Sequence, residues 1–320
     1  MAAARLLIIH QGALGDVVLT FAPIIALRKQ FGRIELLCQG QIGKLAAKLG
    51  LIDTAYPLEA AFWASLFSGR ADAIIKDFIR SYTTIVVFSF SLELENAINE
   101  ITDGPCARIP PRPPARDRIH VTEYLLQNLM NGGLIESTNA HETLSLRHWK
   151  QTPRVDQSME NSKIIIHPGS GSIRKRWPLS RFIKLAGVLE KKGLTPQFVC
   201  GPAETDLDSE IENQNRRVNR FSELTDLVDW LKTADGYIGN DSGISHLAAF
   251  MGIPSVVIFG PSDPERWKPP GPRAQIVRPA VSCDPCFEVD PANCNQPACR
   301  TNATLESVLE AFDGVCGKKE

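Results

Sequence analysis

The sequence predicts an α/β protein with two doubly wound parallel sheets, each covered by helices on both faces. Three observations carry this prediction. Apolar segments of strand length alternate with helix-compatible segments through most of the chain. A polar, proline-containing stretch near the middle, residues 147–162, interrupts the alternation, which then begins again. At 320 residues the chain is also longer than a single domain usually is.

The first predicted domain covers residues 1–150. Its strands are short apolar segments, expected at residues 5–10, 34–38, 55–57 and 84–88. Its helices fill the intervals, at residues 16–31, 42–49, 60–67, 71–79 and 120–130. The prolines of the tract 105–118, PCARIPPRPPARDR, rule out a helix or a central strand, so we expect an extended surface loop there.

The second predicted domain covers residues 151–303 and repeats the pattern. Its strands are expected at residues 163–167, 196–200, 235–238 and 255–259, and its helices at 179–191, 204–214, 224–232 and 244–251. Ligands of such sheets bind at the carboxyl ends of the strands, so we expect a cleft between the domains. Residues 304–320 contain a last helix, for which packing back on the first domain is one arrangement.

The composition is ordinary for a globular protein and excludes some function classes. The formal net charge is −1, which gives no basis for nucleic-acid binding. The longest apolar runs are too short to span a membrane, and the start, MAAARLLIIHQG, is a poor signal peptide. We therefore expect a cytoplasmic protein, with peripheral membrane contact left open.

The first turn with chemical potential is Gly12-Ala-Leu-Gly15-Asp16, between the first strand and its helix. Its glycine spacing does not match the dinucleotide-binding fingerprint. Asp16 lies at a helix start, where the helix dipole favours the ionised carboxylate. Such a carboxylate can accept a proton from an attacking hydroxyl, and the alternative is a plain helix-capping aspartate.

The loop at residues 167–178, HPGSGSIRKRWP, follows a strand and precedes a helix. Its glycines and serines offer N–H and O–H donors, and Lys175 lies between two arginines. This combination suits a diphosphate without a metal, and the alternative is a solvated basic loop. Glu204 follows the next strand and is placed to accept hydrogen bonds from a ribose diol; a first-turn glutamate favoured by the helix dipole is the alternative.

The stretch Gly239–Pro261, GNDSGISHLAAFMGIPSVVIFGP, predicts a strand, a polar cap, a helix and a second strand. The cap contains Asp241, Ser242 and Gly243, at a helix N-terminus whose free N–H groups attract an anion. His246 lies on the first turn and is a candidate for the same ligand, although a lone helix histidine is more often structural.

A cysteine-rich segment follows, with the spacing Cys283-x2-Cys286-x7-Cys294-x4-Cys299. A structural metal site, disulfides and unlinked thiols all remain open, because the second pair lacks the x2 spacing of a good zinc ribbon. A catalytic metal is not expected, since no cluster of carboxylates and histidines accompanies the thiols.

Taken in order, these motifs resemble the lipopolysaccharide heptosyltransferases, glycosyltransferase family 9, whose GT-B fold has two Rossmann-like domains facing a cleft. The resemblance covers nearly the whole chain and is carried by GALGDVVLT, HPGSGSIRKRWP, CGPAE, GNDSGISHLAA and FGPSDP. It implies an inverting, metal-independent transfer of heptose from ADP-heptose to a hydroxyl of the lipid A–inner core acceptor. No cofactor is implied beyond the donor itself.

The resemblance also implies roles for individual residues. Asp16 matches the family's general base in the N-terminal, acceptor-binding domain, and Lys175 matches the lysine on the donor phosphates. Four further residues match the donor-binding segments, namely Ser170, Asp241, Ser242 and Gly243. His246 matches the family's helix histidine, and Glu204 corresponds less closely to the acidic residue near the ribose, because its spacing from the glycine depends on where the count begins.

The acceptor implied by the resemblance is an anionic glycolipid, reached by peripheral contact with the inner face of the cytoplasmic membrane. Arg112 and Arg116 of the proline- and arginine-rich tract are candidates for binding it, with a solvated loop as the alternative. Two other functions remain open: transfer of another nucleotide sugar or to another acceptor, and nucleotide binding without catalysis.

Overall fold

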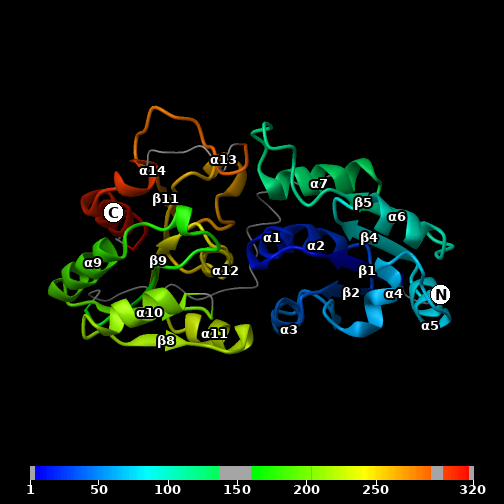
Figure 1. Ribbon diagram of the computed structural model, residues 1–320, viewed down its shortest axis with the longest axis horizontal. Coiled ribbons are helices and arrows are strands. Elements are labelled where there is room, and N and C mark those ends of the chain that lie inside the picture. Colours follow the sequence, from blue (N-terminus) through cyan, green and yellow to red (C-terminus); the bar gives the residue numbers. More distant parts are fainter. Residues whose placement is uncertain (1–3, 137–159, 203, 290–297, 317–320) are drawn as a thin grey trace. The chain divides into compact units, whose positions relative to one another are not determined.

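A computed structural model describes residues 4–136, 160–202, 204–289 and 298–316 of the chain (Figure 1). These residues fall into two compact units. The first comprises residues 4–114 and 121–136, and the second comprises residues 115–120 and those from 160 onward. Each unit contains one sheet in which every strand pairing is parallel, as the sequence predicts.

The first unit alternates strands and helices around a sheet ordered β3-β2-β1-β4-β5. Its strands are β1 (Arg5–His10), β2 (Arg33–Cys38), β3 (Thr54–Pro57), β4 (Thr84–Phe88) and β5 (Cys106–Ile109). Its helices are α1 (Leu14–Leu19), α2 (Phe21–Arg28), α3 (Gly40–Lys48), η1 (Ala61–Trp63), α4 (Ala64–Phe67), α5 (Ala73–Arg80), α6 (Leu92–Asn99) and α7 (Val121–Asn131). Completely buried β1 and β4 side chains, such as Leu7 and Val87, form its core.

The second unit is built around a sheet ordered β11-β10-β9-β6-β7-β8. Its strands are β6 (Lys163–His167), β7 (Thr195–Cys200), β8 (Val218–Arg220), β9 (Gly236–Asn240), β10 (Ser255–Ile258) and β11 (Ala274–Val277). Its helices are η2 (Ile173–Lys175), α9 (Leu179–Lys191), α10 (Thr205–Glu212), α11 (Leu224–Leu231), α12 (Gly243–Phe250), α13 (Pro264–Trp267), α14 (Ala298–Thr301) and α15 (Leu305–Cys316).

The proline- and arginine-rich tract is not a loop throughout. Its first residues form β5, which pairs with β4 on one side only. An edge strand needs only half of its hydrogen-bonding groups, so nearby prolines do not exclude it. Residues 115–120, which the sequence analysis assigned to the first domain, belong to the second unit. There His120 Nε2 donates to the Lys268 carbonyl at 2.9 Å, and Arg266 donates to the Asp117 carbonyl.

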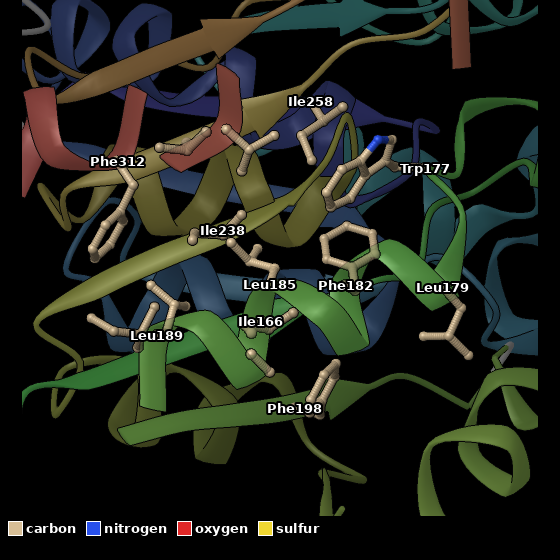
Figure 2. Packing of buried hydrophobic residues seen from close by; sticks show 14 of the residues in the cluster. Ile166, Trp177, Leu179, Phe182, Leu185, Leu189, Phe198, Ile238, Ile258 and Phe312 are labelled. Atoms are coloured by element: carbon tan, nitrogen blue, oxygen red, sulfur yellow. The ribbon is translucent and has the colours of Figure 1, made fainter. Parts of the chain in front are cut away.

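The last helix, α15, belongs to the second unit and packs on its sheet. Its apolar face, with Val308, Ala311 and Phe312, joins the core formed by the strands and α9 (Figure 2). This burial removes apolar surface from water and fixes the helix on its own sheet. Among the described residues, no helix combines the length and apolarity needed to cross a membrane.

Candidate functional site

The carboxyl edge of the first sheet carries Asp16. In the sheet, β2 and β3 lie on one side of β1, and β4 and β5 lie on the other. The chain therefore continues in opposite directions after the neighbouring strands β1 and β4, and the loops that follow them diverge there. The two loops are joined by a hydrogen bond of 2.7 Å from Ser89 Oγ to Gln11 Oε1. The Gly12–Asp16 turn therefore lies at the crevice where doubly wound sheets bind ligands.

Asp16 occupies the third position of α1 and is partly exposed. Its Oδ2 accepts a hydrogen bond of 3.2 Å from the Ala13 N–H, which satisfies one of the free donors at the helix start. This is the only hydrogen bond of the Asp16 carboxylate within the described residues. Asp16 can therefore cap the helix and also act as a base. One carboxylate oxygen accepts the Ala13 N–H, and the side chain remains partly exposed to solvent.

A buried histidine that the sequence analysis missed supports this turn. Gly12 N–H donates to His10 Nδ1 at 2.9 Å, so Nε2 carries the proton and donates to Thr20 Oγ1 at 3.1 Å. Thr20 Oγ1 in turn donates to the Asp16 carbonyl at 2.9 Å. Burial lowers the pKa of His10 to about 4, so the ring is neutral near pH 7. A histidine ending an apolar strand before a glycine turn was the available signal.

Gly12 is required at this turn by close contacts. A Cβ atom at this position would lie 2.6 Å from His10 Cε1 and 2.7 Å from Asp16 Cβ. Any side chain would therefore displace either the histidine or the aspartate.

The carboxyl edge of the second sheet gathers most of the predicted donor-binding residues. In this sheet β7 and β8 lie on one side of β6, and β9 to β11 lie on the other. The loops after the neighbouring strands β6 and β9 therefore meet at the point where the strand order reverses. Ser170 Oγ donates to the Asp241 carbonyl at 2.7 Å. Asn240 Nδ2 donates to the Pro168 carbonyl at 2.7 Å, and Asn240 Oδ1 accepts from Trp177 N–H at 2.8 Å. Buried Asn240 therefore ties the two loops together.

Ser242 caps α12, and Gly243 is the first residue of that helix. The Ser242 hydroxyl accepts from Ser245 N–H at 3.4 Å, and its backbone is extended as a cap requires. The first turn of the helix therefore carries the positive end of the helix dipole at this edge. The structure places this turn beside the loop that contains Ser170.

Asp241 is a buried anion held by two partners. Its Oδ2 lies 2.8 Å from Lys175 Nζ, and its Oδ1 lies 3.6 Å from His246 Nε2. Burial alone would raise the pKa of Asp241, but the His246 hydrogen bond and the Lys175 charge lower it below its ordinary value. The ionised carboxylate is thus committed to positioning Lys175 and His246. The His246 ring is only 3% exposed and faces Asp241, so it does not present itself at the surface.

Glu204 is also turned inward. Its Oε2 accepts from Gly201 N–H at 2.5 Å and lies 3.6 Å from His167 Nε2. Burial alone would raise the pKa of Glu204, but the interactions with His167 and the Gly201 N–H lower it. A Cβ atom on Gly169 would lie 2.2 Å from Glu204 Oε1, so this carboxylate fits against the loop after β6.

His167 connects Glu204 to the helix cap, because its Nδ1 lies 3.2 Å from Ser242 Oγ. The ring is 1% exposed, and from the sequence alone His167 is only the residue that ends a strand before the loop 167–178. The structure therefore assigns Glu204 the support of the loop and cap, while ribose binding by Glu204 stays a prediction.

The two candidate acceptor arginines belong to different units. Arg112 is in the first unit, with its guanidinium carbon 5.5 Å from the centre of the exposed Phe90 ring, which lies in the loop after β4. Arg116 is exposed and belongs to the second unit. The structure thus does not group them within one unit.

The cysteine-rich segment is only partly described, because Cys294 lies outside the described residues. Cys283 is exposed, Cys286 is half-buried and Cys299 is buried. Across the described ranges no three His, Cys, Asp or Glu side chains are grouped as a metal ion would need. These residues alone therefore do not form a metal site.

Comparison with known sequences gives a family match. The profile of glycosyltransferase family 9 (heptosyltransferase) matches residues 124–295, which is more than half of the chain. A curated relative, lipopolysaccharide heptosyltransferase 3 of Escherichia coli strain K12, is 29% identical over 133 residues. That match covers 38% of this chain and 38% of the relative.

Solved structures share the fold across nearly the whole chain. A family 9 glycosyltransferase from Veillonella parvula has a TM-score of 0.76 at 18% identity, covering 98% of this chain and 97% of its own. The E. coli heptosyltransferase WaaC with ADP-2-deoxy-2-fluoro heptose has a TM-score of 0.65 at 15% identity, covering 97% and 99%. TibC, described as an iron-containing heptosyltransferase in complex with ADP-D-beta-D-heptose, has a TM-score of 0.59 at 16% identity, covering 98% and 76%.

Proposed function

Because the chain belongs to glycosyltransferase family 9, the heptosyltransferases, we propose that it transfers a heptose from ADP-heptose to an acceptor hydroxyl of the lipopolysaccharide core. The donor is suggested by the ADP-heptose ligands named for the WaaC and TibC structures. An acceptor in lipopolysaccharide is suggested by the name of the curated relative, and its lipid A–inner core part is our choice within the proposal. The observation that carries the proposal is the Lys175–Asp241 pair beside the start of α12.

The second unit holds the donor diphosphate in this proposal. The free N–H groups of Ser242, Gly243 and Ile244 and the Lys175 ammonium meet the phosphate oxygens, with Ser170 beside them. As the bond from the anomeric carbon to the diphosphate breaks, negative charge grows on the leaving ADP. Fixed donors stabilise that charge, at roughly 3–4 kcal/mol for a strong one.

The first unit supplies the base. The acceptor oxygen attacks the anomeric carbon opposite to the leaving diphosphate, so the configuration inverts, and its proton passes to Asp16. Asp16 suits this role because its carboxylate is partly exposed. Asp241 does not, because it is buried and bound to Lys175 and His246.

The proposed transfer uses no metal or other cofactor, because Lys175 and the helix N-terminus provide the positive charge that the diphosphate needs. A chelator is then expected to leave the transfer rate unchanged. Because TibC is described as iron-containing, the state of the cysteine-rich segment is tested separately from the transfer reaction. Metal analysis and thiol titration of the purified protein distinguish a structural metal, disulfides and unlinked thiols.

The acceptor is an anionic glycolipid in this proposal, reached by peripheral contact with the inner face of the cytoplasmic membrane. Exposed Arg112 and Arg116 are its candidate contacts. Cosedimentation with vesicles tests the contact: binding that needs anionic lipid and weakens in salt is expected. Equal binding to neutral and anionic vesicles would contradict a role for these arginines.

The function is tested by supplying ADP-heptose and a core acceptor to the purified protein and measuring the glycosylated product by mass spectrometry. ADP-, UDP- and GDP-sugars are compared in the same assay and in binding experiments. Product formation with a preference for adenosine donors supports the proposal. Preference for a uridine donor points to another nucleotide sugar, and donor binding without transfer or hydrolysis points to a non-catalytic protein.

A further inference from the structure

A segment distant in sequence, residues 283–289, is docked on the carboxyl edge of the second sheet. The N–H groups of Cys286 and Phe287 both donate to the Pro261 carbonyl, at 3.0 and 3.1 Å. Glu288 Oε2 accepts from Arg266 Nε at 2.8 Å and from Trp267 Nε1 at 2.7 Å. The Arg266 side chain is almost fully buried, so this anchor is shielded from water. The backbone on both sides of the Phe287 side chain is therefore fixed.

The Phe287 ring meets the cations of the loop after β6. Lys175 Nζ lies 4.3 Å from the ring centre, and the Arg174 guanidinium carbon lies 5.7 Å from it. Both distances are within the range in which an aromatic face attracts a cation. Lys175 thus has two partners, the Phe287 ring and the Asp241 carboxylate at 2.8 Å.

We infer that Phe287 is a positioning residue that holds the Lys175 ammonium in place for the donor diphosphate. The inference rests on the proposed role of Lys175 and makes residues 283–289 part of the donor site. A lysine has a flexible four-carbon stem, and fixing it before binding reduces the entropy lost when phosphate arrives. An aromatic face does this without adding negative charge, whereas a second carboxylate beside Asp241 would make the cluster around Lys175 net negative and repel the phosphate.

The first experiment measures ADP binding by calorimetry for the wild type, F287L and F287Y. Leucine keeps an apolar side chain but lacks the ring, and tyrosine keeps the ring. A cation–π contact is worth roughly 0.5–2 kcal/mol, so F287L is expected to weaken ADP binding by about 2- to 30-fold. F287Y is expected to stay within about twofold of the wild type.

The pairing with Lys175 is tested in the K175M background. If the ring acts through the ammonium, F287L adds no further loss of ADP affinity once the ammonium is gone. An equal loss in both backgrounds, or wild-type affinity in F287L, would overturn the inference. Should F287L not fold, F287M replaces it, because methionine is also apolar and lacks a ring.

A second readout needs no ligand and separates this inference from the proposed function. The acetylation rate of Lys175 is measured by peptide mass spectrometry, with exposed Lys184 of α9 as the internal standard. Lys175 is expected to react several-fold faster in F287L than in the wild type or F287Y. Unchanged labelling refutes the positioning role. Failure of the wild type to bind ADP refutes the proposed donor while the labelling still tests Phe287.

Discussion

Replacing Asp241 by asparagine is expected to destabilise the second unit by roughly 2–3 kcal/mol at pH 7. The side chain keeps its shape, but the charge that faces Lys175 at 2.8 Å and His246 at 3.6 Å is removed. Breaking a buried ion pair on one side typically costs about 3–5 kcal/mol, because the other charge stays buried and unpaired. The Lys175 side chain is 19% exposed and also meets the Phe287 ring, so its charge keeps some stabilisation. The expected loss therefore lies at or just below the lower end of that range.

The pH dependence identifies the charge as the cause. The pKa of Asp241 is below its ordinary value, because the His246 hydrogen bond and the Lys175 charge outweigh burial, which alone would raise it. As the pH falls, the unfolded chain takes up this proton first, near pH 4. The stabilisation is thus present above about pH 4 and is lost below it, toward the folded-state pKa.

Urea unfolding of the wild type and D241N, at pH values from 7 to 3, measures this difference. The gap in unfolding free energy is expected to be largest at pH 7 and to shrink below about pH 4. A gap that stays constant across this range would refute the electrostatic argument and assign the loss to packing. A gap under about 0.5 kcal/mol at pH 7 would show that the pair contributes no more than an exposed one.

Three further predictions concern other parts of the two edges. D16N is expected to slow transfer by about 10²- to 10⁴-fold while leaving ADP affinity within about twofold, and a wild-type transfer rate would exclude Asp16 as the base. G169A is expected to destabilise the protein by roughly 1–3 kcal/mol in urea unfolding, since its Cβ would lie 2.2 Å from Glu204 Oε1. G171A is the matched control, because a Cβ placed there would have no atom of a described residue, other than its chain neighbours, within 4 Å; an equal loss in both variants would contradict the steric argument. His10 has its pKa lowered to about 4 by burial, so its contribution to stability is fully present above pH 6.5 and falls between pH 6.5 and 4, a dependence that H10Q is expected to reduce.

The sequence was sufficient to predict the two parallel sheets and the loops that carry the candidate site. Periodicity identifies strands such as β1 and β6, and in parallel sheets the following loops must share one edge. Asp16 and Lys175 could be found because each follows a strand inside a glycine-containing turn. At these positions the sequence pattern and the geometry of a parallel sheet predict the same place, the carboxyl edge of the sheet.

Contacts between residues distant in sequence could not be predicted in this way. The anchoring of residues 115–120 by Arg266 and Lys268, and the ring of Phe287 beside Lys175, join segments with no shared periodicity. The α15 helix has an apolar face that fits either sheet as far as its sequence shows, and only packing against the β10 and α9 side chains decides. Such choices depend on the whole core rather than on any local pattern.

Contacts between residues distant in sequence also determine which carboxylates at the two sheet edges are buried and which stays partly exposed. Asp241 and Glu204 are 3% and 7% exposed, and each is bound to a histidine and to a further group of its own unit. A carboxylate committed in this way keeps its charge but has little freedom to receive a proton from a substrate. Asp16 accepts one hydrogen bond, from Ala13, and remains partly exposed. Burial, which cannot be read from the sequence, is thus the property that favours Asp16 over the other two carboxylates as the proposed base, while Asp241 and Glu204 hold the neighbouring cationic and histidine side chains in place.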